Sequence, residues 1–127
     1  MIHFDHFEIH VRDSAKYVLF LQKLFSGGRY KLISENSTYM FLTPDGIRIE
    51  IKQNNLYQNT FSIDSGIGVC LPCLRSTDAK KHLENLGKVV MTKTINNPDG
   101  DVYFFKDYEQ IDWHIKDYNI LDVYVNI

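Results

Sequence analysis

Cysteine is scarce in this chain, with two residues among 127. Small domains held together by disulfides carry many more, so a disulfide framework is excluded. The sequence also lacks any apolar run near the ~18 residues that a membrane-spanning helix needs. Its first ten residues, MIHFDHFEIH, contain neither the basic nor the apolar segment of a signal peptide. These absences predict a cytoplasmic protein with free thiols and no membrane partner.

An excess of positive charge is missing as well. The formal net charge is -2, from 14 Lys and Arg against 16 Asp and Glu. Proteins that bind nucleic acid usually present a basic surface, so nucleic acid is not an expected partner. A hydrophobic share of 44% and a charged share of 24% are typical of a globular chain. The length allows one ordinary domain with its own core.

Hydrophobic patterns predict the same order of elements twice. Alternating apolar and polar residues indicate strands, and helix formers after a capping residue indicate helices. The first half is expected to contain a strand at 3–11, a helix at 15–25, and strands at 30–33, 38–42 and 47–52. The second half is expected to contain a strand at 66–71, a helix at 78–86, and strands at 88–95, 101–105 and 111–116. An internal repeat of βαβββ order is a stronger clue to the fold than a single motif.

The repeat predicts the organisation of the chain. We expect one domain over residues 1–127, with unit one at about 2–52 and unit two at about 66–117. The polar segment 53–65 is expected to be a linker, and residues 118–127 form an extension outside both units.

Three segments resemble the vicinal oxygen chelate superfamily, which includes glyoxalase I, extradiol dioxygenases, fosfomycin-resistance proteins and bleomycin-binding proteins. FDHFEIHVRD resembles its opening strand, and FLTPDGIRIEI is similar to its turn into the fourth strand. FFKDYEQIDWHI resembles the same hairpin in the second unit, with Tyr-Glu-Gln in place of Pro-Asp-Gly. The resemblance implies an α+β fold in which two βαβββ units form a curved mixed sheet, a half-barrel, with the helices on its outer face. It also implies a homodimer.

The resemblance also implies a metal site. In that superfamily the ligands come from the first and fourth strands of each unit, which correspond here to His6, Glu50 and His114. The remaining first-strand position falls on Gly66, which has no side chain to bind a metal. Two imidazoles and one carboxylate suit a divalent metal such as Fe, Mn, Ni or Zn.

A second register for unit two is open. Pro98-Asp99-Gly100 can be aligned with Pro44-Asp45-Gly46, which places Phe104 opposite Glu50. That alignment leaves the hairpin at 105–116 without a counterpart in unit one, so we favour His114. In either register, a polar strand face is expected of a cavity lining and equally of a sheet facing solvent.

Further residues are candidates for the site on the same polar faces. Glu8 is the candidate catalytic base. The candidate substrate-binding residues are His10, Arg48, Lys52, Cys70 and Tyr103. For the charged residues, simple solvation is the alternative, and for the aromatic residue the alternative is a place in the core.

Three functions follow from these observations. The first is an enzyme, a lyase, isomerase or dioxygenase, that uses a divalent metal to chelate a small molecule with adjacent oxygens. The alternative is a metal-free protein that binds or sequesters a small molecule, of the bleomycin-resistance type. A redox protein that uses Cys70 and Cys73 is a more distant alternative, because the helix is predicted to begin after both cysteines.

Overall fold

The computed structural model describes residues 1–55, 67–71, 76–96, 98 and 101–117. The chain divides into two compact units, Met1–Gln58 and Asn59–Ile127. The expected single domain and the expected homodimer stay predictions.

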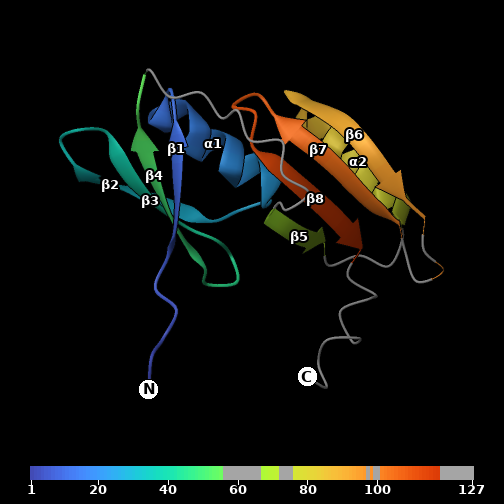
Figure 1. The fold of residues 1–127 in the computed structure, drawn as a ribbon, viewed down its shortest axis with the longest axis horizontal. Helices are drawn as coiled ribbons and strands as arrows, with labels where there is room; N and C mark the ends of the chain where they lie inside the picture. Colours follow the sequence, from blue (N-terminus) through green and yellow to red (C-terminus); the bar gives the residue numbers. More distant parts are fainter. Residues whose placement is uncertain (56–66, 72–75, 97, 99–100, 118–127) are drawn as a thin grey trace. The chain divides into compact units, whose positions relative to one another are not determined.

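Each unit has the order βαβββ (Figure 1). The elements of the first unit are β1 (Phe7–Val11), α1 (Ser14–Leu24), β2 (Arg29–Ser34), β3 (Thr38–Leu42) and β4 (Arg48–Gln53). Those of the second are β5 (Ile67–Leu71), α2 (Ser76–Leu86), β6 (Val89–Ile95), β7 (Val102–Asp107) and β8 (Asp112–Asp117). The predicted repeat is therefore confirmed.

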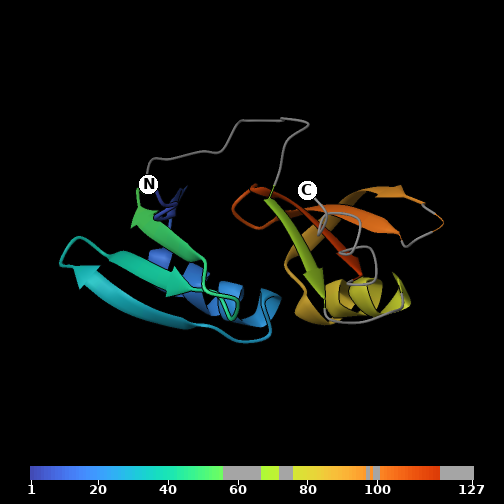
Figure 2. The same ribbon diagram turned by 90° about the horizontal axis from the view of Figure 1, so that it is seen from below.

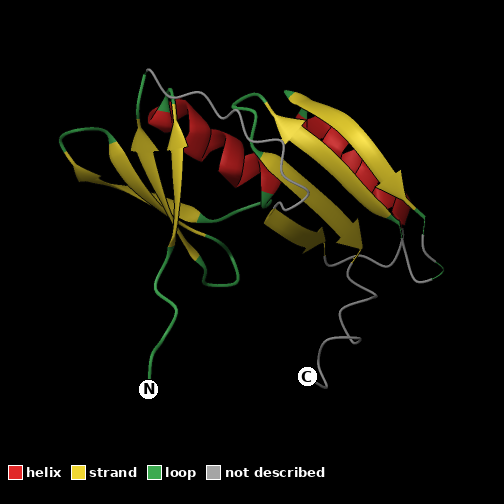
Figure 3. Ribbon diagram, viewed as in Figure 1, coloured by secondary structure: helices red, strands yellow, loops and turns green. Residues whose placement is uncertain are grey.

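Both units contain an open, mixed sheet with the same strand order. The orders are β1-β4-β3-β2 and β5-β8-β7-β6. The first and last strands of each unit are parallel neighbours, and the other pairs are antiparallel. One helix lies on one face of each sheet (Figures 2 and 3). This is the predicted α+β architecture.

Helix α1 begins where the sequence offers a cap. The side chain of Asp13 accepts a hydrogen bond from the backbone N of Lys16 at 3.1 Å. After the C-cap residue Phe25, positive φ angles at Ser26, Gly27 and Gly28 turn the chain out of the helix. Both ends of this helix were thus predictable from local sequence.

The core of each unit lies between its sheet and its helix. In the first unit, alternate residues of the parallel strands β1 and β4 are buried, which leaves the opposite face of these strands to polar side chains. The buried hydrophobic residues of this core are Ile9, Val11, Tyr17, Val18, Phe20, Leu21, Leu24, Phe41, Ile49 and Ile51. The corresponding core of the second unit contains Ala79, Leu83, Tyr103, Phe105, Trp113 and Ile115.

Some predicted boundaries were wrong. Strand β1 starts at Phe7 instead of residue 3, because its pairing with β4 starts at Phe7 opposite Ile49. Helix α2 starts at Ser76 instead of residue 78, since Ser76 and Thr77 belong to its first turn. Strand β7 continues to Asp107. No helix in the described part of the chain is long and apolar enough to cross a membrane.

Candidate metal centre

His6 and Glu50 lie side by side at one end of the first sheet. Strands β1 and β4 are parallel, with Glu8 opposite Glu50, and His6 directly precedes β1. The Nε2 atom of His6 is 3.3 Å from the Oε2 atom of Glu50. The side chains are 34% and 16% exposed, so Glu50 is largely withdrawn from solvent whereas a ligand can still reach the pair.

Asp5 orients the ring of His6. Its Oδ2 atom is 2.6 Å from Nδ1 of His6, on the side of the ring away from Glu50. This hydrogen bond raises the pKa of His6 and lowers the pKa of Asp5, and the nearby carboxylate of Glu50 also raises the pKa of His6. In the neutral tautomer with a proton on Nδ1, the lone pair of Nε2 points toward Glu50. Metal-bound histidines commonly have such a carboxylate partner.

The spacing of the pair fits a metal ion. Nitrogen and oxygen ligands bind a transition metal at ~2.0–2.2 Å, so neighbouring ligand atoms lie about 3.0–3.4 Å apart. The separation of 3.3 Å between His6 and Glu50 falls within this range. Within the described part of either unit, no group of three His, Cys, Asp or Glu side chains gathers to hold a metal. The first unit therefore offers two candidate ligands, His6 and Glu50.

The second unit repeats the hairpin that carries Glu50. In the first unit, Thr43 N donates to the carbonyl of Ile47 at 2.8 Å, and the turn residue Gly46 has a φ of 95°. In the second, Asp107 N donates to the carbonyl of Ile111 at 3.1 Å, and Gln110 has a φ of 66°.

The matching turns place the two fourth strands in register. Glu50 follows Ile47 by three positions, and His114 follows Ile111 by three. The competing register is wrong, because Phe104 lies on β7, the third strand of its unit, and is itself paired with His114. Sequence reasoning found this correspondence although the Pro-Asp-Gly of the first turn is absent from the second.

His114 has a partly buried ring without a hydrogen bond at Nδ1. The ring packs on Phe104 with 5.1 Å between ring centroids, and its Nδ1 atom is buried with no hydrogen-bond partner in the described structure. Burial lowers the pKa of His114, and the charge of Lys116 lowers it further. A neutral imidazole with an unsatisfied nitrogen is the form that a metal requires. The position opposite His114 on β5 is Gly68, and Gly66 lies outside the described residues.

No protein-family model and no curated protein sequence matches the chain. Several solved structures are similar to the chain. FosX, a fosfomycin resistance protein from Listeria monocytogenes, in its monoclinic form at pH 6.5, has a TM-score of 0.77 at 18% identity over 100% of both chains. A mutant of the same protein with Mn(II) and 1S,2S-dihydroxypropylphosphonic acid has a TM-score of 0.74 at 20% identity, over 91% of this chain and 90% of that one. FosX from Mesorhizobium loti has a TM-score of 0.72 at 18% identity, over 97% and 98%.

These FosX proteins are members of the vicinal oxygen chelate superfamily. The chain has the vicinal oxygen chelate fold. The resemblance of its local segments to that superfamily is thereby confirmed at the level of the fold. In this fold, β4 is the fourth strand of the first unit and β8 is the fourth strand of the second, and the two hold the same place in their sheets.

Four more candidate residues lie on β1 and β4, on either side of the His6 and Glu50 pair along these strands. Glu8 accepts from Lys52 Nζ at 2.8 Å and is 3.0 Å from Nε2 of His10. Lys52 Nζ also lies 3.5 Å from Glu50 Oε1. The bonds from Lys52 and His10 lower the pKa of Glu8, so its carboxylate is a weak base here. Arg48 extends to Asp5, with 3.6 Å between Nη1 and Oδ1.

The remaining candidates, Cys70 and Tyr103, belong to the second unit. Tyr103 is 6% exposed and lies on the core face of β7, whereas Phe104 shares the face of His114. This burial removes Tyr103 from the candidate substrate-binding residues. Cys70 lies on β5, where it is paired with Lys116 of β8. Cys73 lies outside the described residues. Among the missed residues, Asp5 had a signal in the sequence, since it immediately precedes a candidate ligand.

Proposed function

We propose that the chain is a metal-dependent enzyme that acts on a small molecule with two adjacent oxygens. The observation that carries this proposal is the 3.3 Å approach of His6 Nε2 to Glu50 Oε2, with Asp5 behind the ring. His114 is the proposed third ligand, because it occupies the position of Glu50 in the second unit. Its unsatisfied Nδ1 supports this role, because burying an unpaired polar atom costs free energy.

Manganese is the first metal to test. Two of the similar FosX structures contain Mn(II), one with 1S,2S-dihydroxypropylphosphonic acid and the other with sulfate. A bound divalent metal would polarise the oxygens of a chelated substrate and stabilise negative charge that develops on them. A three-ligand set would leave coordination positions for both oxygens.

The protein residues would position the reacting groups. Asp5 would hold His6 in the tautomer that presents Nε2, and Glu50 would supply negative charge that offsets the charge of the metal. Glu8 remains the proposed base, in a form weakened by Lys52 and His10. If Lys52 moved away from Glu8 on substrate binding, the basicity of Glu8 would rise.

Electron paramagnetic resonance of Mn(II) tests this proposal on the full chain. Free Mn(II) gives a strong six-line signal, and we expect titration with the wild-type protein to diminish it. We then expect catechol, which carries two adjacent oxygens, to change the spectrum of the bound ion, whereas phenol leaves it unchanged. An undiminished signal of free Mn(II), with Fe, Ni and Zn also failing to bind, would contradict the enzyme and favour a metal-free binding protein.

A further inference from the structure

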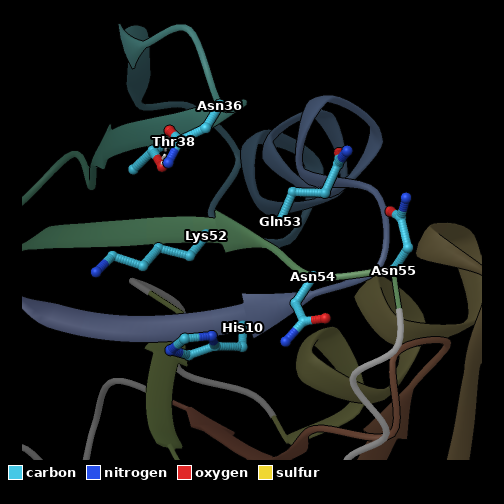
Figure 4. A pocket seen from close by; sticks show the side chains of 7 residues that line it. All are labelled: His10, Asn36, Thr38, Lys52, Gln53, Asn54 and Asn55. Atoms are coloured by element: carbon cyan, nitrogen blue, oxygen red, sulfur yellow. Dashed lines mark hydrogen bonds between the residues drawn. The ribbon is translucent and has the colours of Figure 1, made fainter.

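A polar cavity lies beyond the His6 and Glu50 pair, where strands β1 and β4 end (Figure 4). Its volume is 430 Å³. The residues that line it are His10, Asn36, Thr38, Lys52 and residues 53–55. All of these residues belong to the first unit. The lining contains no aliphatic residue and no Phe, Tyr or Trp. Such a lining excludes the apolar contacts that hold most drug-like molecules.

Internal hydrogen bonds turn two amide groups of this lining into donors. Oε1 of Gln53 accepts from the backbone N of Ser14 at 3.1 Å, and only an oxygen can accept from that N–H. Oδ1 of Asn36 accepts from Thr38 Oγ1 at 2.9 Å. The NH₂ groups of Gln53 and Asn36 have no partner among the residues that the structure describes. The cavity therefore offers hydrogen-bond donors to a ligand with acceptor oxygens.

The charges beside the cavity do not favour an anion. Lys52 is the ammonium group in the lining, and its Nζ already lies 2.8 Å from Glu8 and 3.5 Å from Glu50. An anionic group in the cavity would meet two carboxylates for this one ammonium. A neutral ligand avoids that repulsion and keeps the hydrogen bonds.

The cavity is close to the proposed metal ligands. His10 lies opposite Lys52 in the parallel pair, and Glu8 lies opposite Glu50, two residues earlier on each strand. Two residues of a strand span roughly 6.6 Å. One small molecule can therefore extend from the His6 and Glu50 pair into the cavity.

We propose that the cavity binds an uncharged part of the substrate that is rich in hydroxyl or carbonyl oxygens. That the bound molecule is a substrate rests on the proposed function. The preference of the cavity for uncharged, oxygen-rich molecules over anions and aromatic molecules is independent of any metal.

Nitrogen-15 NMR of the full chain tests this preference directly, because the side-chain NH₂ signals of Asn and Gln are visible. The probes are D-glucose, inorganic phosphate and phenol, each titrated to millimolar concentrations. We expect glucose to shift the NH₂ signals of Asn36, Gln53 and Asn55 saturably. Asn55→Ala, which removes one exposed amide, should weaken glucose binding about 2- to 10-fold, the effect of one lost hydrogen bond.

Asn96→Ala is the matched control, since Asn96 is an exposed residue of the second unit. It should leave glucose binding unchanged. Unshifted amide signals, tighter binding of phosphate or phenol, or full glucose binding by Asn55→Ala would each overturn the proposal. His6→Ala separates this result from the proposed function: glucose binding should persist in that variant whether or not the wild type binds metal.

Discussion

At the scale of single residues, the proposed metal site depends on how Asp5, His6 and Glu50 are arranged. His6 lies between two carboxylates, 2.6 Å from Asp5 on one ring nitrogen and 3.3 Å from Glu50 on the other. The closeness of His6 and Glu50 followed from the resemblance of their two segments to a superfamily whose metal ligands come from the first and fourth strands. The bond to Asp5 did not, since it depends on side-chain rotamers that hydrophobic patterns do not specify.

Removing the carboxylate of Asp5 should weaken metal binding without abolishing it. We expect Asp5→Ala to lower the affinity for Mn(II) about 10-fold, because His6 loses the partner that holds its tautomer. Asp5→Asn keeps an acceptor oxygen and should lose less. Isothermal titration calorimetry measures both, with exposed Glu35→Ala as the control. Equal affinities for wild type and Asp5→Ala would show that Asp5 does not position His6.

The placement of Tyr103 shows a limit of sequence reasoning at this scale. The segment VYFF has apolar or aromatic residues on both faces of its strand. Hydrophobic alternation therefore cannot tell which face is buried, and the contacts of α2 and β8 decide it. In β4 and β8, by contrast, isoleucines or tryptophan alternate with polar residues, and the buried face was predictable.

At the scale of elements, two hairpins with different turn sequences share one backbone geometry. In the first, Ile47 N donates to Thr43 Oγ1 at 2.8 Å, and in the second, Ile111 N donates to Asp107 Oδ1 at 3.1 Å. Both turns thus have a side-chain acceptor at their first residue, and the second turn forms without Pro-Asp-Gly. Because this hairpin sets the register of β8, it also sets the position of His114.

Asp107 should be the most sensitive residue of the second hairpin. It is 2% exposed and accepts from Glu109 N at 2.8 Å, from Ile111 N at 3.1 Å and from Trp113 Nε1 at 2.9 Å. In Asp107→Asn, an NH₂ group must face one of these donors. We expect a loss of about 1–3 kcal/mol in the free energy of unfolding, measured with urea.

Asp112→Asn is the control for that experiment. Asp112 is bonded to Lys106 Nζ at 2.7 Å and is 24% exposed, so its loss should cost less than about 1 kcal/mol. A similar effect of both substitutions would show that the buried bonds of Asp107 do not stabilise the hairpin.

Gly28, in the turn that follows α1, allows a second prediction about stability. Gly28 has a φ of 102°, and a Cβ there would lie 2.5 Å from Phe41 Cζ and 2.8 Å from the carbonyl oxygen of Leu42. Gly28→Ala therefore adds steric overlap to backbone strain, which alone costs about 1–3 kcal/mol. Gly46→Ala is a matched control, since its φ is 95° and nothing lies within 4 Å of the added Cβ.

Urea unfolding of the two glycine variants measures the difference. Overpacking costs roughly 1–3 kcal/mol, so Gly28→Ala should be less stable than Gly46→Ala by at least about 1 kcal/mol. Equal stability of the two variants would mean that Phe41 and the backbone at Leu42 move aside freely.

At the scale of the whole molecule, the repeat is the reason why we propose His114 of the second unit as a third ligand. Elements β4 and β8 hold equivalent places in their sheets, and the sequence carries Glu50 on one and His114 on the other. The element order was predictable from alternation and caps. The number of ligands was not, because residue 66 has no side chain to contribute and a fold can keep its strands while a ligand position is lost.

Metal binding by the full chain tests the central claim most directly. We predict that the wild type binds about one Mn(II) per chain in calorimetric titration. His6→Ala, Glu50→Gln and His114→Ala should each lower the affinity at least about 100-fold, more than the loss of an orienting partner. The controls His82→Ala and Glu84→Gln on α2 should leave it unchanged. The proposed site would be contradicted if the wild type bound no Mn(II). It would also be contradicted if the His6, Glu50 or His114 variant bound Mn(II) as tightly as the wild type.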